Sequence, residues 1–338
     1  MPQTLSRTRL AELLDAASAQ RLAVIGDAML DVYLAGDVDR VSPEAPVPVV
    51  RVRQRRFALG GAANVAQNVG AIGAQCLLVG AIGNDAGGAT LRTMLDAIAV
   101  DDDHLVSVDR PTTTKTRVVA RSQQLLRVDE EDDADLSADE VARMLEAVHA
   151  ALADADALLL EDYNKGVLVP EVITQAIAWA RQREIPIVVD PKYRNFFSYK
   201  GATVFKPNRS ELEAALGAAI NLDDADALPG VFARLGVEHL LLTLGERGMA
   251  LLASDGLVTR IPTMAREVYD VVGAGDTVTA YLGATLAAGA TAAEAAVIAN
   301  YAAGIEVGKL GAATVSPDEV LASYDAHVER QDREARRV

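Results

Sequence analysis

The segment DVVGAGDTVTAYLGATLAAG (residues 270–289) places four glycines and two aspartates in an otherwise uncharged, alanine-rich stretch. Gly273, Ala274 and Gly275 lie where a loop turns into the predicted helix. Backbone N–H groups in the first turn of a helix have no partner within it and carry the positive end of its dipole. The segment therefore predicts an anion site, with Asp276 facing the anion and able to accept a proton from a hydroxyl. In the simpler alternative the glycines form a tight turn, and Asp276 is only a favourable first-turn charge.

Around this segment, short apolar runs alternate with segments of helical period. Strands separated by helices imply right-handed crossovers and an α/β fold with a mostly parallel sheet and helices on both faces. Ligands then bind beyond the carboxyl ends of the strands. The predicted strands are RLAVIGD (21–27), CLLVGAIG (76–83), ALLLED (157–162), IPIVVD (185–190), ATVFKP (202–207) and HLLLTLG (239–245). The predicted helices cover 61–73, 85–99, 137–153, 170–183, 209–217, 274–288 and 291–307.

Two stretches depart from this pattern, VPVVRVRQRRFALGG (47–61) and TTTKTRVVARSQQLLRVDEE (112–131). Both alternate apolar with polar or basic residues, a period of two that is typical of half-exposed antiparallel strands. They predict a small β-sheet lid beside the main sheet, with strands contributed by about 33–57 and 112–129. Since no linker or repeat separates them, residues 1–338 are predicted to form a single domain that carries both insertions.

Composition limits the possible functions. Half of the 338 residues are hydrophobic, so the chain can bury a large core. Its formal net charge of -16 argues against broad binding to nucleic acid or to anionic membranes, and any anionic ligand must be met by local positive groups. The single cysteine, Cys76, cannot form an intramolecular disulfide, which favours a reducing compartment. The N-terminus lacks the apolar core of a signal peptide, and no stretch is typical of a membrane span, so a cytoplasmic protein is predicted.

Four motifs occur in order along the chain: GGAANVAQNVGAIGA (60–74), KPNRSELE (206–213), TLGERG (243–248) and DVVGAGD (270–276). Together they resemble the ribokinase-like (PfkB) sugar kinases. The resemblance implies a ribokinase-like fold and phosphoryl transfer from ATP to a sugar hydroxyl. It also implies that Asp276 is the catalytic base and that the amides of Gly273, Ala274 and Gly275 stabilise the transferring phosphoryl group.

The same resemblance implies a nucleotide site. Asn208 and Glu211 would organise Mg²⁺ and the phosphates through water, and a monovalent cation is a further candidate cofactor. The alternative is that Asn208 and Glu211 form an ordinary helix cap. Core packing is an equal alternative for Asn300, Ala303 and the adjacent Gly304. The predicted nucleotide-binding residues are Asn208, Arg209, Ser210, Glu211, Thr243, Gly245, Gly248, Asn300 and Ala303.

For the sugar, the family pattern points to an aspartate after the first strand, which is Asp31 or Asp27, and to Gly60, Gly61 and Asn64. Carboxylates and an amide suit paired sugar hydroxyls, and glycine lets the ring lie close. The alternative for Asp27 is a turn residue, so Asp31 is the preferred ligand.

Within the family, four further segments resemble the kinases of D-glycero-D-manno-heptose 7-phosphate, which phosphorylate O1 during synthesis of ADP-heptose for lipopolysaccharide cores. These segments are GDAMLDVYLAGDVDRVSPEAPVPVVRV (26–52), TKTRVVARSQQLLRVD (114–129), EDYNKGVL (161–168) and VVDPK (188–192). Such kinases are fused to a nucleotidyltransferase in some bacteria. This chain has no HxGH motif for one, so the stand-alone form is expected.

A substrate that already bears a phosphate needs fixed cations. The first candidates are Lys165 and Lys192, followed by Arg117 and Arg121, with solvated surface charge as the alternative for all four. The basic run RVRQRR (51–56) is interpreted as a solvated lid face or a contact with a second subunit. An exposed edge of the lid predicts a homodimer.

Other function classes lose support. The segment GIEVGKL (304–310) has the wrong spacing for a P-loop, no dinucleotide fingerprint follows the first strand, and the four histidines lack metal-ligand spacing. Two alternatives remain: a ribokinase-like kinase for another sugar or sugar phosphate, and a catalytically silent protein that senses a sugar or a nucleotide. Release of ADP with candidate sugars distinguishes an enzyme from a sensor.

Overall fold

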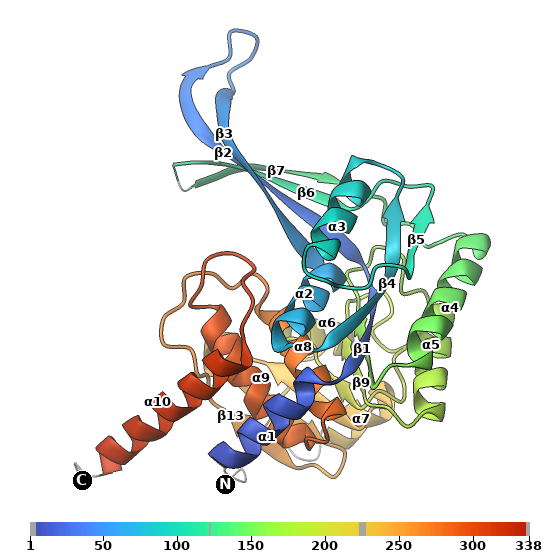
Figure 1. Cartoon of the computed structure of the whole chain (residues 1–338), viewed down its shortest axis with the longest axis vertical. Coiled ribbons are helices and arrows are strands. Elements are labelled where there is room, and N and C mark those ends of the chain that lie inside the picture. The colour runs from blue at the N-terminus through green and yellow to red at the C-terminus, as the bar shows by residue number, and fades with distance from the viewer. Residues whose placement is uncertain (1–4, 122, 223–227, 336–338) are drawn as a thin grey trace.

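The computed structural model describes residues 5–121, 123–222 and 228–335. In this part of the chain, the strands form one nine-stranded sheet and one separate four-stranded sheet. Figure 1 shows the larger sheet among the helices and the smaller sheet projecting at the top of the view. The predicted fold class, a mostly parallel sheet covered by helices with a small second sheet, is confirmed. Within the second predicted insertion, residue 122 lies outside the described residues.

The main sheet has the strand order β13-β12-β11-β10-β9-β8-β1-β4-β5. All neighbours from β5 to β11 pair in parallel, whereas β11, β12 and β13 pair in antiparallel fashion at one edge. The parallel strands are almost continuous apolar runs because helices cover both of their faces. The bounds are β1 (Arg21–Gly26), β4 (Gln75–Gly83), β5 (Leu105–Val108), β8 (Ala157–Glu161), β9 (Ile187–Asp190), β10 (Val204–Phe205), β11 (His239–Thr243), β12 (Met249–Ala253) and β13 (Val258–Ile261).

Helices bury two separate cores against the two faces of this sheet. Alternate residues of β1 show the division: Leu22 and Val24 belong to one core, and Ala23 and Ile25 to the other. The first core is covered by α1 (Arg7–Ser18), α2 (Ala62–Ile72), α3 (Ala86–Asp96), α8 (Ala274–Ala287), α9 (Ala292–Glu306) and α10 (Pro317–Ala335). The second is covered by α4 (Ala138–Ala153), α5 (Pro170–Gln182), α6 (Arg209–Leu216) and α7 (Leu228–Leu235).

The small sheet has the order β3-β2-β6-β7, with β2 (Ala28–Val41), β3 (Pro48–Gly61), β6 (Thr114–Ala120) and β7 (Gln123–Glu130). The predicted lid segments 33–57 and 112–129 therefore contact each other through a parallel pairing of β2 with β6. The stretch 47–61 is the single strand β3, which forms an antiparallel hairpin with β2, and the stretch 112–131 forms the antiparallel hairpin of β6 and β7. Since β2 and β6 pair with each other at the centre of the small sheet, their hairpin partners β3 and β7 form its two edges.

Several elements were not predicted. The strand β5 has only four residues, and β12 and β13 form a hairpin after the TLGERG motif, where the sequence indicated only a nucleotide-binding turn. Helix α7 contains the pair Pro229 and Gly230, which usually marks a turn. Helix α10 is polar over much of its length, so its period is weak. Among the described residues, no helix is both long enough and apolar enough to cross a membrane.

Candidate active site

The carboxyl ends of four neighbouring strands carry a row of side chains. Gly26 of β1 pairs with Glu161 of β8, and Glu161 pairs with Asp190 of β9. Lys206 follows β10 directly, and β10 pairs with β9. Paired residues of adjacent strands project to the same side, so Glu161, Asp190 and Lys206 are neighbours. Position 26 requires glycine, because a β-carbon there would lie 2.0 Å from the carbonyl oxygen of Glu161.

Helix α8 begins against this row. Its N-cap, Gly273, has a φ of +96°, a left-handed conformation that favours glycine. A β-carbon at Gly275 would lie 3.6 Å from Lys206 Nζ and 3.7 Å from Asp190 Oδ2. The first turn of the helix therefore packs directly on the charged row, where its N–H groups favour an anion.

Asp276 is held in this first turn by two side chains from distant segments. The Asn64 Nδ2 group donates a hydrogen bond of 2.6 Å to Asp276 Oδ2, and the Tyr163 hydroxyl donates one of 3.0 Å to Oδ1. Asn64 lies in α2, and Tyr163 follows β8. Asp276 is only 5% exposed. Its carboxylate is thus fixed in orientation by donors on both oxygens.

Burial has the largest effect on the pKa of Asp276. Burial raises its pKa to about 6, with a further rise from Asp190, while the hydrogen bonds from Asn64 and Tyr163 act in the opposite direction. A general base is most effective when its pKa lies near the operating pH. The carboxylate of Asp276 therefore has the position and the proton affinity expected of a base.

Lys206 is the buried cation of the site. Its Nζ lies 2.7 Å from Asp190 Oδ2, and the two side chains are 3% and 9% exposed. Burial acts to lower the pKa of Lys206, but Asp190 and Glu161 outweigh it and raise that pKa. Lys206 thus remains an ammonium group beside the start of α8.

The carboxylates also fit a divalent cation. Glu161, Asp190 and Asp276 each place an oxygen within 4.8 Å of the others. Both carboxylate oxygens of Glu161 are buried and have no hydrogen-bond partner within the described part of the chain. Burial, and then the charges of Asp190 and Asp276, raise the pKa of Glu161 well above its usual value. Mg²⁺ at kinase sites takes one or two carboxylates together with substrate phosphates, so Glu161 and Asp190 are the residues that would hold it.

Asn208 and Glu211 form a capping box at the start of α6, as the helix-cap alternative predicted. The Glu211 N–H donates to Asn208 Oδ1 at 2.8 Å, and the Asn208 N–H donates to Glu211 Oε2 at 2.8 Å. The second oxygen of Glu211 accepts from Lys192 Nζ at 2.7 Å. Lys192 Nζ also lies 5.2 Å from the centre of the Tyr163 ring. The structure therefore brings Lys192 to the predicted metal residues, beside the tyrosine that holds Asp276.

The glycine-rich motif lies at the end of β11. Thr243 forms a backbone bridge with Asn208, which brings the two nucleotide motifs together. A short 3₁₀ helix, η1 (Gly245–Arg247), follows. Gly248, with a φ of +84°, approaches the neighbouring hairpin so closely that a β-carbon would lie 2.2 Å from the carbonyl oxygen of Ile261.

Asn300, Ala303 and Gly304 lie on one side of α9. Asn300 is buried and donates from Nδ2 to the carbonyl oxygen of Pro262 at 2.7 Å. A β-carbon at Gly304 would lie 2.8 Å from the Ala265 nitrogen. These contacts are packing contacts, and the adenine role of this helix face stays a prediction.

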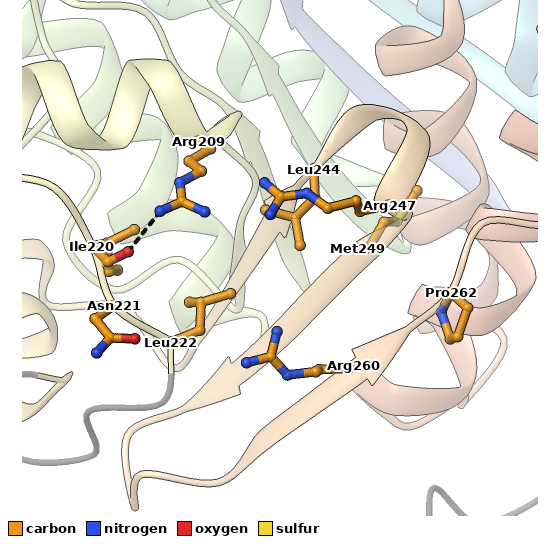
Figure 2. Close-up of a pocket in the computed structure, with 9 residues that line it drawn as sticks. All are labelled: Arg209, Ile220, Asn221, Leu222, Leu244, Arg247, Met249, Arg260 and Pro262. Carbon is orange, nitrogen blue, oxygen red and sulfur yellow. Dashed lines mark hydrogen bonds between the residues drawn. The ribbon is translucent and has the colours of Figure 1, made fainter.

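Arg209 and Ser210 do not join the carboxylates. Arg209 donates to Glu213 Oε1 at 2.8 Å and to the carbonyl oxygen of Ile220 at 3.0 Å. Arg209 lines a cavity of about 290 Å³ together with Arg247 and Arg260. Figure 2 shows these three side chains around the cavity. Ser210 is exposed in the first turn of α6.

The predicted sugar residues lie at the base of the small sheet. Asp31 is 8% exposed and is ion-paired with Arg117 of the neighbouring strand. A β-carbon at Gly60 would lie 3.3 Å from Asp31 Oδ2, so the two predicted sugar ligands are adjacent. Gly61, with a φ of +56°, begins the turn into α2, and Asn64 contacts Asp276 as described above.

Asp27 has a different place. Its carboxylate accepts hydrogen bonds from the backbone N–H groups of Tyr163, Lys165 and Val167 at 2.7, 3.0 and 3.3 Å. Burial raises the pKa of Asp27 to about 6. Asp27 therefore organises the loop after β8, which includes the tyrosine that contacts Asp276.

The predicted phosphate-binding cations are dispersed. Lys165 Nζ pairs with Glu131 Oε1 at 2.7 Å, between the loop after β8 and the segment after β7. Arg121, with a φ of +50°, lies at the β6–β7 turn. It is six residues beyond Lys115, the β6 partner of Asp31, or about 20 Å along an extended strand. The structure therefore does not bring Arg121 to the sugar residues.

Five residues near the site were not singled out from the sequence: Glu161, Tyr163, Asp190, Lys206 and Glu306. Four of them end or directly follow a parallel strand, which is where ligands bind in such sheets. Glu306 lies near the C-terminus of α9, and a β-carbon at Gly273 would lie 3.2 Å from its Oε1. Burial raises the pKa of Glu306 to about 8. Charged residues at the strand ends could have identified Glu161, Asp190 and Lys206, but not Tyr163 or Glu306.

The fold and the comparisons below define a phosphotransferase that acts on sugars, and the buried Asp276 carboxylate beside a helix N-terminus agrees with that class. The chain belongs to the pfkB family of carbohydrate kinases, whose family model matches residues 19–319. Among curated proteins it is similar to the bifunctional protein HldE of Rhodospirillum rubrum, with 46% identity over 317 residues. That alignment covers 93% of this chain and 64% of the HldE protein. The HldE protein of Caulobacter vibrioides is 45% identical, with coverage of 93% and 65%. The chain thus spans less than two thirds of the length of these relatives.

Solved structures share the ribokinase-like fold. Ribokinase of Arabidopsis thaliana, complexed with ribose and ATP, has a TM-score of 0.70 and 22% identity, covering 90% of this chain and 98% of that one. Phosphofructokinase-2 of Escherichia coli, in complex with potassium, has a TM-score of 0.74 and 20% identity, covering 91% and 98%. The resemblance stated from the four motifs is therefore confirmed at the level of the family and the fold.

Proposed function

We propose that this protein transfers the γ-phosphoryl group of ATP to O1 of D-glycero-D-manno-heptose 7-phosphate, giving the 1,7-bisphosphate, with Asp276 as general base. The observation that carries the kinase mechanism is the buried Asp276 carboxylate, fixed by Asn64 and Tyr163 at the N-terminus of α8. The support for the heptose is the resemblance of four sequence segments to heptose 7-phosphate kinases, together with the similarity to proteins named HldE.

Each group in the site has a physical role in this proposal. Asp276 accepts the O1 proton as the oxygen attacks phosphorus, and the N–H groups of Gly273 to Gly275 stabilise the charge on the transferring group. Lys206 and Lys192 add fixed positive charge, and Glu161 and Asp190 would hold Mg²⁺. When bound, Mg²⁺ neutralises the phosphate charge that develops during transfer. Positioning and charge supply most of the catalysis in such reactions.

The substrate is tested by measuring ADP release with heptose 7-phosphate, the unphosphorylated heptose, fructose 6-phosphate, fructose and ribose. We expect heptose 7-phosphate to have the highest kcat/KM. In an otherwise acidic protein, a few fixed cations at the site favour a substrate that carries a phosphate group. A higher kcat/KM for fructose 6-phosphate or ribose would leave a sugar kinase with another substrate. No ADP release with any sugar would favour the sensor alternative.

Replacing Glu211 by glutamine should raise the Mg²⁺ concentration needed for half-maximal activity several-fold, because one of the carboxylates near the phosphates loses its charge. The KM for the sugar should change little. The matched control is Glu140→Gln, since Glu140 forms the same capping box with Ser137 at the start of α4, away from the site. If the two variants give the same Mg²⁺ titration, Glu211 serves only as a helix cap.

The pKa of Asp276 predicts a pH dependence. A base works only when deprotonated, so kcat/KM should level off above about pH 6 and fall about tenfold per unit below it. Initial rates between about pH 5 and about pH 8, with folding checked at each pH, measure the profile. A flat profile down to pH 5 would exclude a base of this pKa.

The cellular context follows from the same proposal. The enzyme would act in ADP-heptose synthesis in the cytoplasm, with ATP and the sugar phosphate as its partners and neither nucleic acid nor membrane. A monovalent cation is a further candidate cofactor. The exposed edge strand β7 and the apolar side chains of Phe57, Leu126 and Val128 support a homodimer through the small sheet. Light scattering across a dilution series tests it, and a monomer at every concentration would contradict it.

A further inference from the structure

One row of side chains crosses all four strands of the small sheet. Arg56 of β3 and Arg117 of β6 are both register partners of Tyr33 in β2, and Arg117 is the partner of Arg127 in β7. Directly paired residues project to the same face of a sheet. The guanidinium carbons of Arg56 and Arg117 lie 4.9 and 5.4 Å from the centre of the Tyr33 ring. Two guanidinium groups thus share one aromatic ring.

This row lies on the face that carries the predicted sugar residues. Asp31 is two residues before Tyr33 in β2, so both project to the same side, and Asp31 is ion-paired with Arg117. Arg56 also reaches the main domain, since a β-carbon at Gly311 would lie 3.3 Å from its Nη2. The Gly311 N–H donates to Asp270, the first residue of the segment that leads into α8. The row therefore faces the side of the main domain where α8, the helix that carries Asp276, begins.

The charges on this face are not balanced. Arg117 pairs with Asp31, and Arg127 with Asp129. Arg56 has no carboxylate partner among residues 5–121, 123–222 and 228–335. The cationic side chains gathered here are Arg56, Lys115, Arg117, Arg127 and Lys165, and the carboxylates that pair with them are Asp31, Asp129 and Glu131. In a chain of net charge -16, this excess of positive charge marks a place for an anion.

We propose that Arg56, with Arg117 and the hydroxyl of Tyr33, binds the phosphate group that the acceptor sugar already carries. This inference rests on the proposed function and deepens it. A guanidinium group matches two phosphate oxygens with parallel N–H donors, which a lysine cannot do. Arg117 is oriented by Asp31 and Arg56 is free to meet the anion, so the two define one clamp beside the sugar residues.

The neighbouring groups support this assignment over the lysines. The Tyr33 phenol is a hydroxyl donor at neutral pH, and burial raises its pKa further. Lys165 and Lys192 are already paired, with Glu131 and Glu211. The phosphate of the acceptor then lies on the small sheet, and its reacting hydroxyl lies at Asp276. The sugar phosphate would thereby draw the sheet and the main domain together.

The test uses the whole chain and calorimetric titration, with heptose 7-phosphate and the same heptose without phosphate as probes. Arg56→Gln should weaken binding of heptose 7-phosphate about ten- to a hundredfold and leave the unphosphorylated heptose within about twofold. The matched control is Arg55→Gln, which removes the same charge from the next residue of β3, on the opposite face of the strand. Arg56→Lys should recover part of the loss. In steady-state assays, the Arg56→Gln variant should show a raised KM and a nearly unchanged kcat.

The possible results separate the two proposals. Equal binding of heptose 7-phosphate by the Arg56→Gln and Arg55→Gln variants would overturn the role of Arg56, and the proposed function would stand. Equal losses for both sugars would also overturn it, because they would assign Arg56 to the folding of the sheet. If the wild-type protein itself shows no preference for the phosphorylated sugar, the proposed substrate fails, and the clamp fails with it.

Discussion

Replacing Asp276 by asparagine should lower kcat about 10²- to 10⁴-fold while folding and nucleotide binding are retained. The amide has nearly the shape of the carboxylate, but it cannot accept the proton of the attacking hydroxyl. The Tyr163 hydroxyl can still donate to the amide oxygen, whereas the new NH₂ group requires the Asn64 amide to rotate and present its oxygen. Single-turnover kinetics at saturating sugar and ATP measure the chemical step without product release.

The matched control for this variant is Asp139→Asn. Asp139 also lies in the first turn of a helix, α4, but it is outside the candidate site. Its replacement removes the same charge from the first turn of another helix and should leave kcat unchanged. A kcat for Asp276→Asn within twofold of the Asp139→Asn value would remove Asp276 from the mechanism.

Replacing Lys206 by methionine should produce the largest loss of stability. Methionine fills similar space, but Asp190 and Glu161 would then be buried without their cation. Removing one partner of a buried ion pair typically costs about 3–5 kcal/mol of unfolding free energy. That is a large fraction of the stability of an ordinary domain, about 5–15 kcal/mol. Denaturant unfolding of the wild type and the variant measures the difference.

Two further variants show whether the loss arises from the ion pair. Lys200→Met changes an exposed lysine and should alter the free energy of unfolding by less than about 0.5 kcal/mol. Adding Asp190→Asn to Lys206→Met should recover part of the stability, since one uncompensated charge is removed. An unfolding free energy for Lys206→Met equal to that of Lys200→Met would mean that the charged row is not buried as described.

Local patterns predicted much of this fold. The apolar runs at the centre of the parallel sheet could be identified because helices cover both faces and leave no alternation. The small sheet could be identified from its period of two. The hairpin β12–β13 and the strand β5 could not, since short edge strands depend on the partner that they pair with rather than on their own residues. The parallel pairing of β2 with β6 could not be predicted either, because it depends on how the two hairpins assemble.

The residues of the candidate site also divide into those that the sequence could predict and those that it could not. Gly273 to Asp276 could be proposed from the sequence because the predicted anion site and the predicted base lie within one turn of one helix. The contact of Asn64 with Asp276 joins residues 212 positions apart, so the sequence could not show it, and the sugar-binding role of Asn64 stays a prediction. Glu161 and Lys206 lie within two of the segments that resemble the family. Their place in the candidate site depends on the strand order that makes them neighbours, which the sequence does not show.

The most direct test of the central claim is ³¹P nuclear magnetic resonance of the product formed from heptose 7-phosphate and MgATP. The account predicts a new signal from a phosphate on the anomeric oxygen, formed together with ADP, and the Asp276→Asn variant should form it at most at about one hundredth of the wild-type rate. Consumption of ATP without an anomeric phosphate, or equal formation of it by both proteins, would contradict the account.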